Sequence, residues 1–339
     1  MNIKMTLFYS LIITLFSVIL SLDIAFSSSF NARTRGKSID SLAISQLTNQ
    51  VDSTEIKKVV DKLAGVRFER ANKTHMQACR QYIASEFEKH GLEVSTQAVI
   101  GKDLSGVNII GKHQGESDSC IVLGAHYDTV WNSPGADDNA SGVSSVIEIS
   151  RLFNRVKTKY TILFVAFDLE EYGFLGSDQF VAKYGSKIKA AFLLDMVGYV
   201  SKGVNSQKFP KVLRKRYSTI QQKLQTEKMV GDFVLVTANE HATDLQQILV
   251  KCTNNYVSDL KVVSIVADDN GKDYPRFFRA GDHVAFWNHN IKSVYLGDTA
   301  GLRNSNYHSK RDLPNTLSIP FLTDVTKAVL ASLITLSSD

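Results

Sequence analysis

The stretch GAHYDTVWNSPGADDNASGVSSVIEI, residues 124–149, joins the end of a predicted strand to the start of a predicted helix. It follows the apolar run CIVL directly, and it contains one histidine, His126, and three aspartates, Asp128, Asp137 and Asp138. Like charges crowded into one place are unfavourable unless a positive charge lies among them. We therefore predict a strand–loop–helix unit whose loop holds cations, and a pair of divalent metal ions suits this number of acids.

Apolar strands alternate with amphipathic helices along most of the chain. Continuous apolar runs at 120–128, 159–171 and 188–200 predict buried strands, and helical patterns at 140–156 and 174–185 follow the first two. This alternation is typical of a covered, mainly parallel sheet in an α/β domain. Further strands are expected at 92–100, 106–113, 232–238 and 293–298. Helices are expected at 53–65, 74–91 and 314–336, and residues 201–232 read as a polar, helical excursion at the rim.

Acidic residues stand at the ends of the three apolar strands. His126 and Asp128 end the first, Glu170 and Glu171 end the second, and Asp195 ends the third. Ligands of such sheets collect beyond the carboxyl ends of the strands. The sequence therefore predicts one site at that edge.

Each of these residues also has an ordinary structural explanation. Asp137, Asp138 or Asn139 could cap the following helix, although one cap needs only one side chain. Neighbouring residues of an extended chain point in opposite directions, so one of Glu170 and Glu171 could bind metal while the other faces the cleft. The late histidine candidates are His308 and His283.

Taken together, the residues form a ligand set. Carboxylates of Asp138, Glu171 and Asp195 with the imidazoles of His126 and His308 suit two zinc ions. Asp128, two residues after His126, could hold that imidazole in one tautomer. The three cysteines, Cys79, Cys120 and Cys252, lack the spacing of a metal or redox motif.

The segments GAHYD, PGADDNASGV, EEYGFLGS, LLDMVGY, GDHVAFW and YHSKRD resemble metallopeptidase family twenty-eight, the co-catalytic di-zinc aminopeptidases. The resemblance runs from about residue 55 to 336. It implies a single α/β/α sandwich with a mixed, mainly parallel sheet of about eight strands. It also implies that His126 and Asp195 hold one zinc, that Glu171 and His308 hold the other, and that Asp138 bridges them. Glu170 falls on the general base of the family and Asp128 on its histidine-orienting acid.

The expected function is hydrolysis of N-terminal residues from peptides that have a free N-terminus. One alternative is a transferase like the glutaminyl cyclases, with a single zinc. A carboxypeptidase or dipeptidase of the same family also remains open, and so does a binding domain that has lost its chemistry. A net charge of +5 with no dominant basic block argues against nucleic-acid binding.

Residues 1–27 are expected to be a signal peptide, with Lys4 before an apolar run at 5–22 and a small-x-small cleavage site at 25–27. Export to a secreted or periplasmic location follows, and retention as a membrane anchor is the alternative. A polar linker is expected at 28–52 and the peptidase domain at 53–339. No other stretch is expected to cross a membrane.

Overall fold

The computed structural model describes residues 41–338 of the chain. The predicted signal peptide, 1–27, lies outside the described residues. In the described part, eight strands form one sheet: β1 (Glu93–Ile100), β2 (Ser105–His113), β3 (Ser117–His126), β4 (Tyr160–Phe167), β5 (Ile188–Leu194), β6 (Phe233–Asn239), β7 (Lys261–Ala267) and β8 (Lys292–Gly297). The helices are α2 (Ser41–Thr48), α3 (Ser53–Leu63), α4 (Glu69–Lys89), α5 (Gly142–Phe153), α6 (Leu175–Tyr184), α7 (Ser218–Thr226), α8 (Thr243–Tyr256), α9 (Pro275–Phe278), α10 (His283–Asn288) and α11 (Ile319–Ser338).

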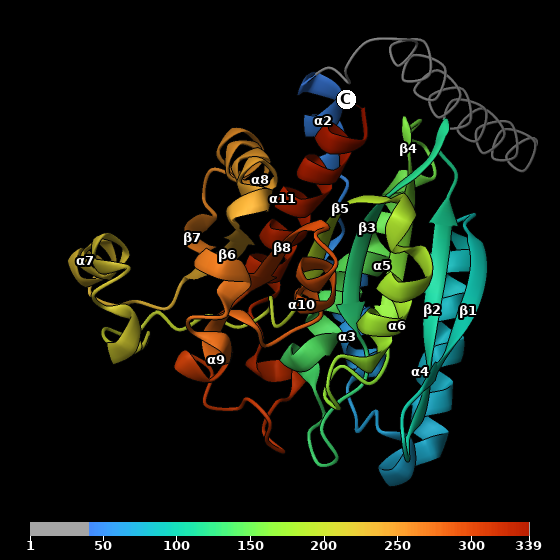
Figure 1. Ribbon diagram of the computed structural model, residues 1–339, viewed down its shortest axis with the longest axis horizontal. Coiled ribbons are helices and arrows are strands. Elements are labelled where there is room, and N and C mark those ends of the chain that lie inside the picture. Colours follow the sequence, from blue (N-terminus) through green and yellow to red (C-terminus); the bar gives the residue numbers. More distant parts are fainter. Residues whose placement is uncertain (1–40, 339) are drawn as a thin grey trace, which may run out of the picture.

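The sheet is mixed, with the strand order β1-β2-β4-β3-β5-β8-β6-β7. Its centre is parallel, because β3 pairs in parallel with both β4 and β5, and β5 pairs in parallel with β8. The pairs β1/β2, β2/β4 and β6/β8 are antiparallel. Figure 1 shows β1 and β2 at one side of the molecule, β6 and β7 at the other, and α7 beyond them. The predicted α/β fold with about eight strands is confirmed.

Helices cover both faces of the central strands. Alternate residues of each strand point in opposite directions, so each face of the sheet carries apolar side chains that a helix layer buries. In β3, Ile121 and Leu123 belong to the large core shared with α3, α5, α8 and α11. Val122, between them, packs instead with Phe180 of α6 and Phe286 of α10. Continuous apolar strands are thus explained by burial on two sides, and the molecule has three layers.

Two terminal helices differ from the expectations. Helix α2 lies inside the stretch predicted as a linker at 28–52, and its residues Ala43, Ile44 and Leu47 are buried in the core. The folded domain therefore begins before residue 53. Helix α11 is long and apolar enough to cross a membrane, which was not expected, but 67% of its most apolar window is buried inside the fold. Its hydrophobicity is accounted for by core packing.

Several local predictions also need revision. Helix α4 begins at Glu69, before the predicted start at residue 74, and contains a kink at Asn72. The side-chain oxygen of Asn72 accepts the N–H of His75 at 3.2 Å and so caps the regular part of the helix. Strand β7 and helix α8 were not predicted. Residues 201–231 form the expected excursion, which contains η3 (Lys211–Leu213) and α7. The three cysteines are buried and unbridged.

Arg67, completely buried, ties the loops around β3 to the end of α3. Its guanidinium donates to the carbonyl oxygens of Leu63 at 2.8 Å, Pro134 at 2.9 Å and Gly135 at 2.7 Å, and also to that of Tyr127. Gly135 has a φ of 61°, and a Cβ there would lie 2.6 Å from Nη2 of Arg67. The loop of residues 133–138 therefore takes its path around this one buried cation.

Replacing Arg67 with methionine should lower the free energy of unfolding by about 3 kcal/mol or more, because several buried carbonyl oxygens lose their donor. Urea denaturation measures the change. The control is Arg214→Met on the exposed excursion, expected to stay within about 0.5 kcal/mol of the parent. Equal stability of the two variants would contradict the structural role of Arg67.

Candidate metal centre

The predicted ligands meet at the carboxyl edge of the central strands. His126 is the last residue of β3, Glu170 and Glu171 follow β4, and Asp195 follows β5. Asp138 comes from the helical turn η1 (Ala136–Ser141), which leads into α5, and His308 from the loop after β8. All six side chains line one cavity of about 460 Å³. Residues far apart in the sequence are thus brought together, as the strand-end pattern predicts.

The ligand atoms form two groups that share Asp138. The first contains His126, Asp138 and Asp195, and the second contains Asp138, Glu171 and His308. Nε2 of His126 lies 3.3 Å from Oδ1 of Asp138 and 3.5 Å from Oδ1 of Asp195. Nε2 of His308 lies 3.1 Å from Oδ2 of Asp138 and 3.1 Å from Oε2 of Glu171. The two oxygens of one carboxylate therefore face different groups.

The two glutamates do not lie on an extended chain, as the sequence suggested. They occupy a turn in which Leu169 has a φ of 58°, and both side chains line the cavity. The carboxylate of Asp128 accepts the backbone N–H of Glu170 at 3.1 Å and that of Glu171 at 3.2 Å. Its Oδ1 also lies 3.5 Å from Nδ1 of His126. The nearer partner of this Nδ1 is the backbone carbonyl oxygen of Asp128 at 3.3 Å, so Asp128 contacts the histidine and the glutamate turn together.

Three consecutive polar residues of η1 have three different roles. The side chain of Asn139 caps α5 by accepting the N–H of Gly142 at 2.9 Å, and it donates to the carbonyl of Leu194 at 2.8 Å. Asp137 points away from the cluster, accepting the N–H of Gly198 at 2.9 Å and the amide of Asn304 at 2.8 Å. Asp138 alone turns into the cavity. The capping explanation thus holds for Asn139 and not for the acids.

Asp312 is a positioning residue that sequence reasoning missed. Its carboxylate accepts the backbone N–H of Asp137 at 2.9 Å and that of Asp138 at 3.0 Å. It stands four residues after His308, within the segment YHSKRD, so it connects the loop of one candidate ligand to the turn that carries another. The only sequence signal was its place in that segment.

Burial and neighbouring charges shift the pKa values of the cluster strongly. Burial raises the pKa of Glu170 well above its usual range, with Asp195 adding to the effect, and burial and Asp138 raise the pKa of Glu171 to about 7. Burial alone would lower the pKa of His308, but its bonds to Asp138 and Glu171 raise it to about 10. Burial likewise opposes protonation of His126, yet Glu170 and the other acids raise its pKa well above normal. The cluster attracts positive charge, as a cation site must.

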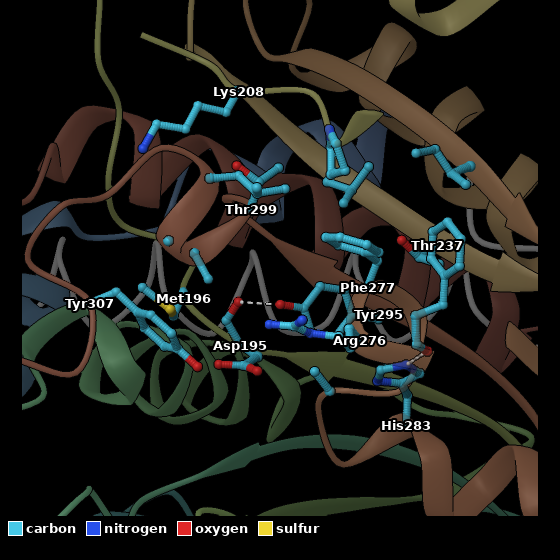
Figure 2. A pocket seen from close by; sticks show the side chains of 18 of the residues that line it. Asp195, Met196, Lys208, Thr237, Arg276, Phe277, His283, Tyr295, Thr299 and Tyr307 are labelled. Carbon is cyan, nitrogen blue, oxygen red and sulfur yellow. Dashed lines mark hydrogen bonds between the residues drawn. The ribbon is translucent and has the colours of Figure 1, made fainter. Parts of the chain in front are cut away.

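His283, the other late histidine candidate, does not belong to either group. Its Nε2 lies 2.8 Å from the carbonyl oxygen of Phe278, and its ring packs against Trp287 and Tyr295. Burial lowers its pKa to about 4, so the ring is neutral. The ring nevertheless lies near Asp195, since a Cβ on Gly281 would be 3.2 Å from Nδ1 of His283 and 3.4 Å from Oδ2 of Asp195. Figure 2 labels both side chains.

Comparison with known proteins identifies the family. The model of peptidase family M28 matches residues 108–333. An uncharacterized protein, YfbL, of Escherichia coli K12 is 28% identical over 267 residues, covering 75% of this chain and 78% of its own. Aminopeptidase YwaD of Bacillus subtilis 168 is 43% identical over 82 residues, which are 23% of this chain and 18% of that protein. A probable zinc metalloprotease of Pyricularia oryzae is 25% identical, covering 70% of this chain and 53% of its own.

Solved structures show the same fold. The LapA aminopeptidase of Legionella pneumophila superposes with a TM-score of 0.67 at 21% identity, covering 88% of this chain and 75% of its own. An aminopeptidase from Aneurinibacillus sp. strain AM-1 gives a TM-score of 0.64 at 15% identity, covering 86% of this chain and 95% of its own. The resemblance seen in the sequence motifs is confirmed by the family model, which matches well over half of the chain: the protein belongs to peptidase family M28 and is a hydrolase of the metallo-exopeptidase class.

Proposed function

We propose that the protein is a zinc-dependent aminopeptidase that removes N-terminal residues from peptides, using two metal ions and Glu170 as the general base. The names of relatives support the activity, since they include an aminopeptidase and a probable zinc metalloprotease. Support for the number of ions comes from the geometry of the cluster.

The observation that carries the proposal is the position of Asp138. Its two oxygens face two separate groups, each with one imidazole and one further carboxylate, the groups of His126 and His308. Imidazole and carboxylate ligands suit zinc, and a carboxylate is well suited to lie between two cations. His126 and Asp195 would hold one ion, Glu171 and His308 the other, with Asp138 between them. Asp128 would orient His126, as the acid behind a metal-bound histidine usually does.

Bound in this way, the ions would polarise the scissile carbonyl and lower the pKa of the attacking water. Glu170 belongs to neither ligand group, yet its Oε2 lies only 3.9 Å from Nε2 of His126. Its burial raises its pKa and so its affinity for a proton. Glu170 would accept the proton of the water and pass it to the leaving amine. The free α-amine of a peptide would lie at this centre, beside the residues that hold the second ion.

The alternatives differ either in the metal site or in the end of the substrate that they bind. A cyclase-like transferase with one zinc needs only one of the two groups, whereas here Asp138 is shared between two. A carboxypeptidase or dipeptidase would use a similar cluster and differ in which end of the substrate it binds. We favour the aminopeptidase because a relative is named as one, and hydrolysis of free-amine substrates beside N-blocked ones tests the choice.

We also propose that the protein is exported. The support is the sequence of residues 1–27 alone, with Lys4, an apolar run and a cleavage site. A secreted or periplasmic enzyme follows from cleavage, and an anchored one from retention of this segment.

The bridge is tested by Asp138→Asn beside Asp137→Asn. Asp138→Asn should lose at least one zinc and nearly all activity, because a neutral amide is a poor ligand for two cations. Asp137→Asn is the matched control, because Asp137 lies buried in the same turn and points away from the cluster, so its substitution should change zinc content and activity much less. Zinc content and kcat are measured for both. Equal zinc content and equal kcat in the two variants would mean that Asp138 is wrongly assigned as the bridging ligand.

Zinc binding should release protons. Imidazole must be deprotonated to bind metal, and the pKa of His308 is raised to about 10 in this cluster, so protons compete with zinc below that pH. Zinc affinity should therefore rise with pH from 6 to 8. Calorimetry of the chelator-treated protein, repeated in buffers of different ionisation enthalpy, counts the protons. Affinity that is independent of pH would contradict ligation by His308.

Glu170→Gln should separate chemistry from metal binding. The variant should keep both zinc ions and bind substrate nearly as before, while kcat falls by about 10²–10⁴-fold, as expected when a general base is removed. Glu171→Gln is the comparison, and it should lose the second zinc. Full activity of Glu170→Gln would refute the mechanism, and loss of its zinc would show that the two glutamates exchange roles.

A further inference from the structure

Three successive backbone N–H groups of the glutamate turn donate to buried carboxylates. Asp128 accepts those of Glu170 and Glu171, at 3.1 and 3.2 Å. The N–H before them, that of Leu169, is accepted at 2.9 Å by Oδ1 of Asp168, whose side chain is completely buried. Leu169 has a φ of 58°, a conformation that leucine rarely adopts, so the turn needs these bonds to keep its shape.

Asp168 also connects the turn to three other elements of the fold. Its Oδ2 accepts the backbone N–H of Val107 in β2 at 2.8 Å and an N–H of Nη2 of Arg80 in α4 at 2.9 Å. The same oxygen lies 2.7 Å from the hydroxyl of Tyr127, the residue after β3. Figure 1 shows α4 and β2 on the same side of the molecule. One carboxylate therefore connects β2, α4 and the end of β3 to the start of the glutamate turn.

Tyr127 is the partner of Asp168 that stands nearest to the metal centre in the sequence. It lies between His126, a candidate ligand, and Asp128. Its ring is completely buried, and its hydroxyl accepts the Nε–H of Arg80 at 2.8 Å. None of the side chains of Tyr127, Asp168 and Arg80 lines the cavity of the metal centre. Any effect of these three residues on the reaction must therefore pass through other residues.

These bonds close a ring around the backbone of Glu170. The ring runs from the hydroxyl of Tyr127 to Asp168, and then along the chain to Glu170. The N–H of Glu170 donates to Asp128, which follows Tyr127 directly in the chain. Glu170 is thereby fixed relative to His126, whose Nε2 lies 3.9 Å from its Oε2. The ring sets the distance between the candidate base and the metal centre.

Packing does not hold the turn on every side. A cavity of about 110 Å³ lies against Asp168 and Leu169, and Arg80 lines it too. A Cβ on Gly106 in β2 would lie 2.8 Å from Cγ of Asp168, so a glycine is needed for this carboxylate to approach β2 so closely. Hydrogen bonds to Asp168, rather than apolar contacts, hold the turn on that side.

We infer that Tyr127, Asp168 and Arg80 are positioning residues that place Glu170 for proton transfer without touching the reacting atoms. The inference rests on the proposed function, in which Glu170 is the general base. A general base must lie within hydrogen-bond reach of the water that it deprotonates, and a displacement of about 1 Å costs about 100-fold in rate. Loss of the Tyr127 hydroxyl should therefore lower kcat while the zinc ligands stay in place.

The test is Tyr127→Phe, which removes one hydroxyl and keeps the ring. In the zinc-loaded enzyme, with a free-amine p-nitroanilide as substrate, kcat should fall by about 10–100-fold while KM and zinc content stay unchanged. Tyr217→Phe is the matched control, because it also removes a hydroxyl that donates within the fold, to the carbonyl of Val266 at 3.1 Å. It should leave kcat unchanged.

A double-mutant cycle with Glu170→Gln separates positioning from a general loss of structure. If the Tyr127 hydroxyl acts through Glu170, Tyr127→Phe should cause no further loss of kcat in a chain that already carries Glu170→Gln. Arg80→Met should give the same pattern, because it removes both hydrogen bonds that α4 donates to the network. The same fold-loss with and without Glu170→Gln would overturn the inference, as would a wild-type kcat in Tyr127→Phe.

Hydrogen exchange tests the network independently of activity. In Tyr127→Phe, the amides of residues 169–171 should exchange at least about tenfold faster than in the wild type, and in Tyr217→Phe they should be unchanged. Full activity of Glu170→Gln would refute the proposed general base and not the network. Faster exchange in Tyr127→Phe would then still support the positioning of the turn, and unchanged exchange would contradict it.

Discussion

The crowding of carboxylates at one edge of the sheet is the constraint on which the rest of the structure depends. Asp138, Glu170, Glu171 and Asp195 line the same cavity, and burial makes each isolated negative charge costly. The raised pKa values of the neighbouring histidines show how strongly the cluster favours positive charge. A fold that places these acids together must either hold protons there or bind cations.

The surrounding structure holds the acids through their backbone, so their side chains stay free for the cavity. Asp128 accepts the N–H groups of the glutamate turn, and Asp312 accepts those of Asp137 and Asp138. Arg67 fixes the loop that precedes Asp137 by donating hydrogen bonds to the carbonyl oxygens of Pro134 and Gly135. Buried hydrogen bonds of this kind make a ligand set rigid before any ion binds, which is what a preorganised catalytic site requires.

The sequence predicted those parts of the molecule whose signals are local. The apolar runs located the central strands, and the acids at their ends located the site. Strand β7 was missed because it is the edge strand of the sheet and is buried only at alternate residues, so the apolar pattern of KVVSIVA is weak. The roles of Arg67 and Asp312 could not be predicted, since most of their partners are backbone atoms distant in the chain. The turn at Leu169 was also missed, because a positive φ at leucine has no local signal.

The far end of the cavity was the least predictable part, because it depends on how the excursion 201–231 lies over β6 and β7. Polar composition showed only that these residues lie at the rim. Three apolar residues of the excursion line the cavity: Leu213, Ile220 and Leu224. Their position could be recognised only once β6 and β7 were placed opposite them. The candidate ligands thus come from strand ends and nearby turns, whereas the far end of the cavity is lined by an insertion between strands.

The central claim, two zinc ions joined by Asp138, is tested most directly by anomalous X-ray diffraction from crystals of the zinc-loaded enzyme at the zinc edge. The account predicts two anomalous peaks about 3.5–4 Å apart. One should lie beside His126 and Asp195, the other beside Glu171 and His308, with one oxygen of Asp138 toward each. A single peak at full zinc loading, or a pair of peaks without Asp138 between them, would contradict it.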